Sequence, residues 1–207
     1  MNYRASSFII AREAWPFALP LAVLAALLAW LGMNILATLT TVLFIYVLAF
    51  FRNPQRTPDT PNEADVVCPA DGRVVAAGLV SHPGFEGGQA LRIAIFMNIF
   101  NVHINWAPVG GQVMAATHHC GRFLNAMQDK CADENERKVL ELCTAEGTPV
   151  VVKLVAGLIA RRIVCPLEEG DQIRRGEKIG LIRFGSRVEV LLPATSELRG
   201  RTGQFVR

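Results

Sequence analysis

The dipeptide Gly185-Ser186 carries the most distinctive chemistry in the sequence, and it lies close to the C-terminus. The serine hydroxyl lies near the glycine carbonyl, whose carbon no side chain shields. In a strained turn the hydroxyl can attack that carbonyl and form an ester, if a base takes its proton and donors hold the oxyanion. β-Elimination would then split the chain and leave a dehydroalanine that hydrolyses to a pyruvoyl group. A serine in a tight turn is more commonly a simple turn residue.

Two further side chains are candidates to assist such a reaction. His103 lies in an apolar segment, and a strand there would place Asn101, His103 and Asn105 on one face. Histidine titrates near neutral pH and suits the role of base, although a lone buried histidine is often a satisfied core group. Asp71 would orient and charge-balance His103 as the third member of a triad. The alternative for Asp71 is a plain Pro-x-Asp-Gly turn.

Other motifs are weaker or absent. Residues 121–126 have the polar composition of a loop that lines a site, or equally of a solvated surface. His118 and His119 have no partner at ligand spacing, so no metal site is expected. There is no P-loop or GxGxxG motif to indicate nucleotide binding. The net charge of +3 is too small to indicate nucleic-acid binding.

The N-terminal region predicts a membrane anchor. Residues 14–51 contain no charged side chain. As one helix they would span roughly 57 Å, nearly twice the thickness of a bilayer core. A break at residues 32–34 would leave a helical hairpin with spans at 14–31 and 35–51, and the arginines on both flanks favour cytoplasmic ends. A re-entrant anchor or one tilted span is the alternative.

The anchor, residues 1–51, is followed by a proline-rich linker at 52–65 and a folded domain at 66–207. Short β-branched runs and regularly spaced glycines predict a mainly β (α+β) domain with a compact sandwich or barrel-like sheet. The expected strands include 91–97, 150–155, 159–164, 178–182 and 188–192. One stretch, 133–143, is expected to form a helix with Asp133 as its N-cap.

Several motifs together form a more specific pattern. They are residues 50–54, 69–72, 95–105, 121–126, 135–137, 156–162 and 183–187. In order and spacing they resemble the short bacterial form of the phosphatidylserine decarboxylase proenzymes over nearly the whole chain. The resemblance implies an enzyme that cuts itself between Gly185 and Ser186. The products would be a β chain, 1–185, and an α chain, 186–207, which we call the large and small chains.

The resemblance also implies a cofactor, a substrate and a location. The cofactor is a pyruvoyl group derived from Ser186, without a metal. It serves as an electron sink while phosphatidylserine is converted to phosphatidylethanolamine and CO2. The two chains would stay together as a heterodimer, with a higher oligomer left open. The enzyme would lie in the bacterial inner membrane with its site at the cytoplasmic face, and without a nucleic-acid partner.

By motif, the aspartate and histidine that assist the serine in this family fall on Asp71 and His103. Longer family members carry two histidines close together, whereas here Trp106 stands near the second position. Either His103 serves both maturation and decarboxylation, or another group takes one role. The candidates for substrate binding are Arg122, Asn125, Arg161 and Arg162.

Two other classes remain as alternatives. Residues 69–74 and 169–177 also resemble hairpins of lipoyl- or biotinyl-type carrier barrels, but no lysine has the flanking methionine typical of those domains. A membrane-anchored serine hydrolase would use Ser186 against a substrate, but the Gly-x-Ser-x-Gly elbow is absent. Both alternatives predict an intact chain.

Overall fold

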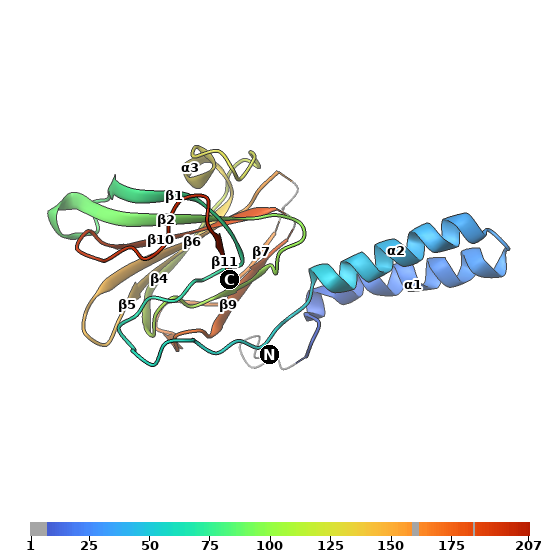
Figure 1. Ribbon diagram of the computed structural model, residues 1–207, viewed down its shortest axis with the longest axis horizontal. Helices are drawn as coiled ribbons and strands as arrows, with labels where there is room; N and C mark the ends of the chain where they lie inside the picture. The colour runs from blue at the N-terminus through green and yellow to red at the C-terminus, as the bar shows by residue number, and fades with distance from the viewer. Residues whose placement is uncertain (1–7, 159–161, 184) are drawn as a thin grey trace. The chain divides into compact units, whose positions relative to one another are not determined.

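A computed structural model describes residues 8–158, 162–183 and 185–207 (Figure 1). The chain divides into two compact units, of which one ends at Gln55 and the other covers Arg56–Arg207. The second unit contains the candidate catalytic residues, and its described regular elements are strands apart from the 3-10 turn η3 (Glu86–Gly88) and one short helix.

The described strands of this unit form two sheets in which every neighbouring pair is antiparallel. The large sheet has the order β11-β1-β2-β10-β6-β5-β4-β8, and the small sheet has the order β3-β9-β7. The strands are β1 (Gly72–Ser81), β2 (Gln89–Met97), β3 (Ile104–Trp106), β4 (Gly111–His119), β5 (Arg137–Cys143), β6 (Pro149–Val155), β7 (Ile163–Val164), β8 (Gln172–Ile173), β9 (Lys178–Ile182), β10 (Ser186–Pro193) and β11 (Phe205–Val206).

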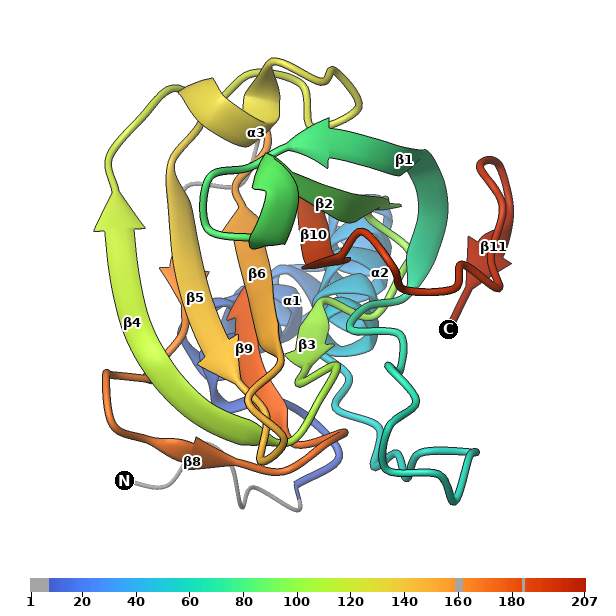
Figure 2. The same ribbon diagram turned by 90° about the vertical axis from the view of Figure 1, so that its left-hand side faces the viewer.

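The large sheet curls, and the small sheet lies on its concave side (Figure 2). Alternate side chains of the central strands point into the space between the sheets, among them Ile95 of β2, Val152 of β6 and Val188 of β10. Ile179 of β9 meets them from the small sheet. This shared apolar core stabilises the domain. The expected mainly β, sandwich-like architecture is confirmed.

The helix expected at 133–143 is wrong for most of its length. The short helix α3 (Cys131–Glu134) ends before this stretch becomes a strand, and β5 then pairs with β4 and β6. Leu140 and Leu142 are buried while Glu141 between them is exposed. That period-two pattern and the two neighbouring strands outweigh the helical preference of the residues.

The strand expected through residues 101–105 is also shorter than predicted, because β3 begins only at Ile104. Before it, the chain turns between Asn98 and Asn101. The backbone N–H of Asn98 donates to Oδ1 of Asn101 at 2.8 Å, and the N–H of Asn101 donates to the carbonyl of Asn98 at 3.0 Å. Asparagine side chains commonly close turns in this way.

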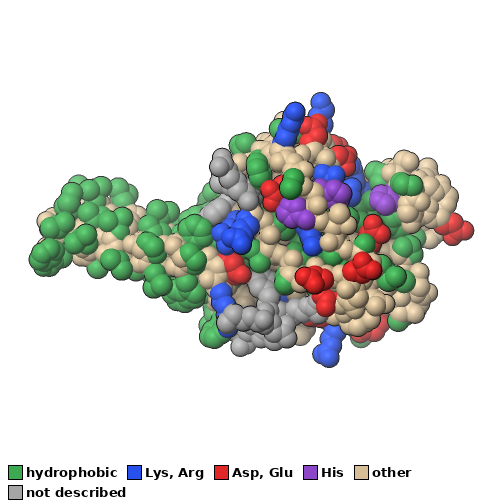
Figure 3. Space-filling model, turned by 180° about the vertical axis from the view of Figure 1, so that it is seen from behind, with side chains coloured by type: hydrophobic (Ala, Val, Ile, Leu, Met, Phe, Trp, Pro, Cys, Tyr) green, Lys and Arg blue, Asp and Glu red, His purple; other side chains and the backbone are tan. Residues whose placement is uncertain are grey.

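The first unit is a pair of apolar helices. The 3-10 turn η2 (Arg12–Ala14) leads into α1 (Trp15–Trp30), and α2 (Asn34–Phe50) follows after a break at Gly32, where φ is +73°. The helical stretch Arg12–Trp30, 19 residues, is long and apolar enough to cross a membrane, and α2 is shorter. The helix surface is almost entirely hydrophobic (Figure 3), which is consistent with membrane association.

Candidate active site

Ser186 is the first residue of β10, where the chain passes from the small sheet to the large one. It lies on the same strand face as Val188, so its side chain points into the space between the sheets. The residue is fully buried, and its Oγ has no hydrogen-bond partner in the part of the chain that the structure describes. A buried hydroxyl without a partner costs about 1–3 kcal/mol, so its presence here requires an explanation.

The bond before Ser186 is shaped by two glycines. Gly185 has φ of +68°, a left-handed conformation that glycine adopts without strain. Its carbonyl oxygen packs against Gly157, where a Cβ atom would lie only 2.0 Å from that oxygen. Gly157 therefore makes room for the carbonyl that the serine would attack. In the sequence, Gly157 is part of the 156–162 motif, with no specific role assigned to it.

His103 is fully buried beside this bond. Its Nδ1 lies 3.0 Å from the carbonyl oxygen of Asn101. Because a carbonyl only accepts, the neutral ring carries its proton on Nδ1 and leaves Nε2 as an acceptor. Nε2 accepts a hydrogen bond from the backbone N–H of Gly185 at 3.4 Å. The structure thus brings His103, Gly185 and Ser186 together.

The buried carboxylate of Asp71 is held by Arg56 through two contacts, Nη1 to Oδ1 and Nη2 to Oδ2, the latter at 2.7 Å. The Arg56 guanidinium lies 4.5 Å from the centroid of the Trp106 ring, a geometry that adds cation–π attraction. The orienting role of Asp71 toward His103 stays a prediction. Arg56, its ion-pair partner, appears in the sequence only as a charge that follows the apolar region.

Of the four candidates for substrate binding, Arg162 lies close to the Gly185 turn, whereas Arg122 is an exposed surface residue. The carbonyl of Arg162 accepts a hydrogen bond at 3.4 Å from the N–H of Arg183, beside the Gly185 turn. The Arg122 side chain is 76% exposed and lies 3.5 Å from Glu134.

Asn125 is exposed, and its Oδ1 accepts from the N–H of Met127 at 3.0 Å. Arg161 lies outside the described residues. The binding roles of all four candidates stay predictions.

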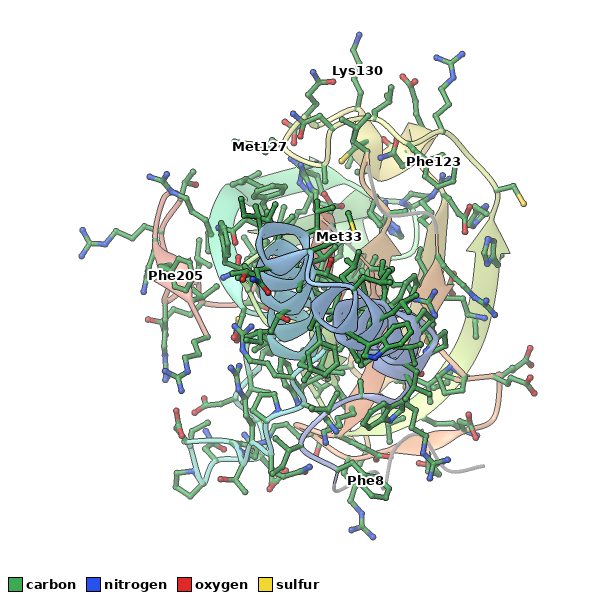
Figure 4. All side chains as sticks on the ribbon, turned by 90° about the vertical axis from the view of Figure 1, so that its right-hand side faces the viewer. Phe8, Met33, Phe123, Met127, Lys130 and Phe205 are labelled. Atoms are coloured by element: carbon green, nitrogen blue, oxygen red, sulfur yellow. The ribbon has the colours of Figure 1, made fainter. Side chains whose placement is uncertain are left out.

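Three exposed apolar side chains lie on segments that reach the Gly185 turn. Phe100, Leu158 and Met127 are 71%, 67% and 58% exposed. Phe100 lies on the loop after β2, the strand whose end pairs with the start of β10. Leu158 follows Gly157, and Met127 follows Ala126, which packs at the same glycine. Figure 4 labels Met127 and Lys130 on the same loop, and the Lys130 side chain extends away from the domain.

Other reactive groups offer little competing chemistry. Burial raises the pKa of the Cys131 thiol to about 11 and also raises the pKa of the Cys68 thiol. Both stay protonated at neutral pH and are poor nucleophiles. Within the described ranges, no three His, Cys, Asp or Glu side chains come together in a way that would hold a metal ion.

Comparison with known proteins identifies the family of the chain. The chain is 47% identical to a phosphatidylserine decarboxylase proenzyme of Aromatoleum aromaticum and 45% identical to one of Burkholderia vietnamiensis, each over 199 residues. These alignments cover 96% of the chain, and 91% and 92% of the two relatives. Residues 43–207 match the phosphatidylserine decarboxylase family. The chain belongs to that family.

Membership of the phosphatidylserine decarboxylase family makes the protein a carboxy-lyase and confirms the resemblance seen in the motifs. Gly185, Ser186, His103 and Asp71 all lie within the matched range. The carrier-barrel alternative gains no support from the fold, because Lys138, Lys153 and Lys178 lie within strands and Lys130 directly precedes α3 in the long connection between β4 and β5. A carrier lysine must instead stand at an exposed hairpin tip.

Proposed function

We propose that this chain converts phosphatidylserine to phosphatidylethanolamine and CO2 after cutting itself between Gly185 and Ser186. The observation that carries the proposal is the Ser186 hydroxyl, which is buried and unpaired among the described residues. It directly follows the left-handed Gly185, whose N–H contacts the acceptor nitrogen of the His103 imidazole. The relatives carry the name proenzyme, which supports processing of the chain.

Self-cleavage would begin with attack of Ser186 Oγ on the carbonyl carbon of Gly185, after Nε2 of His103 releases the Gly185 N–H and turns to take the hydroxyl proton. The peptide C–N bond breaks, and an ester joins the two residues. Loss of the Cα proton of residue 186 then breaks the Cβ–Oγ bond and releases Gly185 as a carboxylate. Water adds to the remaining dehydroalanine, ammonia leaves, and a pyruvoyl group begins the small chain.

The surroundings of residue 186 fit a pyruvoyl group. A pyruvoyl ketone condenses with a primary amine and accepts the electron pair left when CO2 departs, which no ordinary side chain does. Burial of residue 186 between the sheets keeps bulk solvent away from the reacting atoms, so that water enters only as single molecules. His103 would hold or return a proton there, and the exposed apolar side chains of Phe100, Leu158 and Met127 suit the acyl part of a lipid.

We further propose that the two cut chains stay together and are held at the membrane. Strand β10 lies between β2 and β6 near the middle of the large sheet, so the small chain would keep both strand neighbours after cleavage. The helices of residues 1–51 would form a hairpin in the bilayer with both ends cytoplasmic, followed by the 52–65 linker. In this proposed arrangement a lipid-processing domain would lie at the cytoplasmic face of the membrane.

Reductive trapping tests the proposed cofactor. The full-length protein would be mixed with phosphatidylserine in detergent micelles and treated with cyanoborohydride, which fixes an adduct between a ketone and an amine. We expect the small chain to gain the mass of phosphatidylethanolamine less one oxygen atom, because condensation expels water and the reduction adds two hydrogens. An unmodified small chain in a preparation that turns over the lipid would contradict a pyruvoyl cofactor. Labelling of Ser186 in an intact chain by a fluorophosphonate would support the hydrolase alternative.

The Gly157→Ala substitution is expected to block maturation. The added methyl group would meet the Gly185 carbonyl oxygen at 2.0 Å, so that carbonyl must move away. A shift of about 1 Å between reacting groups costs on the order of 100-fold in rate. We therefore expect cleavage to slow about that much, as measured by the fraction of cut chain over time on denaturing gels.

Gly200→Ala is the matched control, since the nearest atom to its new Cβ would be Oε1 of Gln204 at 3.8 Å. This variant should be cut at the unmodified rate. Normal cleavage of Gly157→Ala would show that the Gly185 carbonyl need not occupy its observed position.

A further inference from the structure

A buried cluster of charges lies behind the proposed cleavage site, on the face of β10 opposite Ser186. Arg187 and Glu189 alternate with the core-facing residues of the strand and are nevertheless almost fully buried. Nε of Arg187 donates to Oε1 of Glu189 at 2.8 Å, and Nη2 lies 2.6 Å from the same oxygen. Buried charges of this kind persist only when they are paired.

The cluster also joins the two chains that cleavage would create. Nη2 of Arg187 lies 2.9 Å from Oδ1 of Asp129, and Nη1 donates to the carbonyl of Gln128 at 3.4 Å. Arg92 of β2 lies 3.5 Å from Asp129 and 3.9 Å from Glu189. Two guanidinium groups thus balance two carboxylates. Arg187 and Glu189 belong to the proposed small chain, whereas Gln128, Asp129 and Arg92 belong to the large one.

The electrostatics agree with a persistent ion pair. The hydrogen bond from Arg187 lowers the pKa of Asp129 below its ordinary value. Burial alone would lower the pKa of Arg187, but the Glu189 and Asp129 carboxylates raise it. Both partners therefore keep their charges at neutral pH.

Cleavage would make this cluster more important than it is in the uncut chain. Before the cut, residue 186 is held on both sides by peptide bonds. Afterwards it is a chain end with one strand neighbour, because Ser186 pairs with Met97 of β2 while pairing with β6 begins only at Arg187. The next side chain along the small chain is that of Arg187.

We propose that Arg187 is a positioning residue that fixes the newly made end of the small chain by ion-pairing to Asp129 of the large chain. This inference rests on the proposed self-cleavage. The reactive carbon of residue 186 is adjacent to this anchor, so a loosened guanidinium would leave the chain end free to shift. Cleavage itself uses the uncut backbone and should depend little on the ion pair.

Asp129→Ala tests the anchor from the large-chain side. The Asp129 side chain is 70% exposed, so its removal should leave the fold intact. We expect normal self-cleavage but a fall in kcat of about tenfold, less than the roughly 100-fold cost of a full 1 Å displacement, with KM changed much less. Rates on phosphatidylserine micelles would be normalised to hydrazine-titrated carbonyl, so that loss of folded enzyme does not contribute. Asp129→Glu, which keeps the carboxylate, should restore part of kcat.

Asp133→Ala is the matched control. Asp133 lies in the same segment, is 82% exposed and pairs at 3.7 Å with Lys153, which also belongs to the large chain. Its removal should leave kcat unchanged. Arg187→Lys keeps the charge but not the planar fork and should lower kcat as Asp129→Ala does.

The possible failures are distinguishable. If the unmodified chain is cut and active while Asp129→Ala and Arg187→Lys both keep the unmodified kcat per carbonyl, the positioning role is wrong and the proposed function stands. A drop in Asp133→Ala equal to that in Asp129→Ala would also overturn the role, because it would reflect the segment as a whole. If the unmodified chain is never cut, the proposed function fails and this inference fails with it.

Discussion

Ser186→Ala is expected to yield a single uncut chain of 207 residues without decarboxylase activity. Alanine has no hydroxyl to attack the Gly185 carbonyl and no oxygen to leave in the elimination, so neither the cut nor the pyruvoyl group can form. Activity on phosphatidylserine should fall to the background rate. Intact mass under denaturing conditions and formation of phosphatidylethanolamine measure the two effects.

The same variant should fold at least as well as an uncut chain that retains its serine. Ser186 Oγ has no partner among the described residues, so the substitution breaks no hydrogen bond there and removes a buried polar atom. The free energy of unfolding is expected to rise by about 1 kcal/mol or stay unchanged. Ser196→Ala, also in the small chain, is the control and should be cut normally. Decarboxylation by Ser186→Ala would show that the cofactor does not come from this serine.

His103→Gln has the second largest expected effect. Glutamine preserves a polar side chain of similar reach but cannot take up a proton at neutral pH. General base catalysis contributes about 10²–10⁴-fold, so we expect cleavage to slow by about that factor. Time courses of cleavage after synthesis of the chain measure this directly.

His118→Gln is the control for this substitution, because His118 is exposed on β4 and lies 3.5 Å from Glu136. It should be cut at the unmodified rate. Normal cleavage of His103→Gln would move the role of base to another group, with Asp71 as the next candidate. If His103→Gln is cut at the normal rate but does not decarboxylate the lipid, His103 acts in decarboxylation and not in cleavage.

The sequence predicts the parts of the fold that depend on local pattern. Alternating or continuous β-branched runs identify β2, β6 and β10, and the Gly32 break between the helices follows from the length of the apolar region. Residues 133–143 are mispredicted because neighbouring strands determine their conformation. The register that places β5 between β4 and β6 is a long-range property.

In the candidate site, too, residues with distinctive local chemistry can be predicted from the sequence, whereas long-range contacts cannot. Ser186, Gly185 and His103 carry recognisable chemistry, and the structure brings them together. Gly157 lies in the 156–162 motif, but its role cannot be read from the sequence because that role depends on a carbonyl 28 residues away in the chain. The ion pair between Arg187 and Asp129 cannot be predicted from the sequence either. The two charged residues are far apart in the chain, and their side chains meet only in the folded domain.

The most direct test is the intact mass of the purified, unmodified protein under denaturing conditions. We expect two chains, the smaller one made of the 22 residues from position 186 onward. Its first residue should be blocked to amine reagents and reactive toward hydrazines. A single chain of 22.7 kDa that stays uncut after addition of anionic lipid would contradict self-cleavage, and with it the pyruvoyl-dependent mechanism.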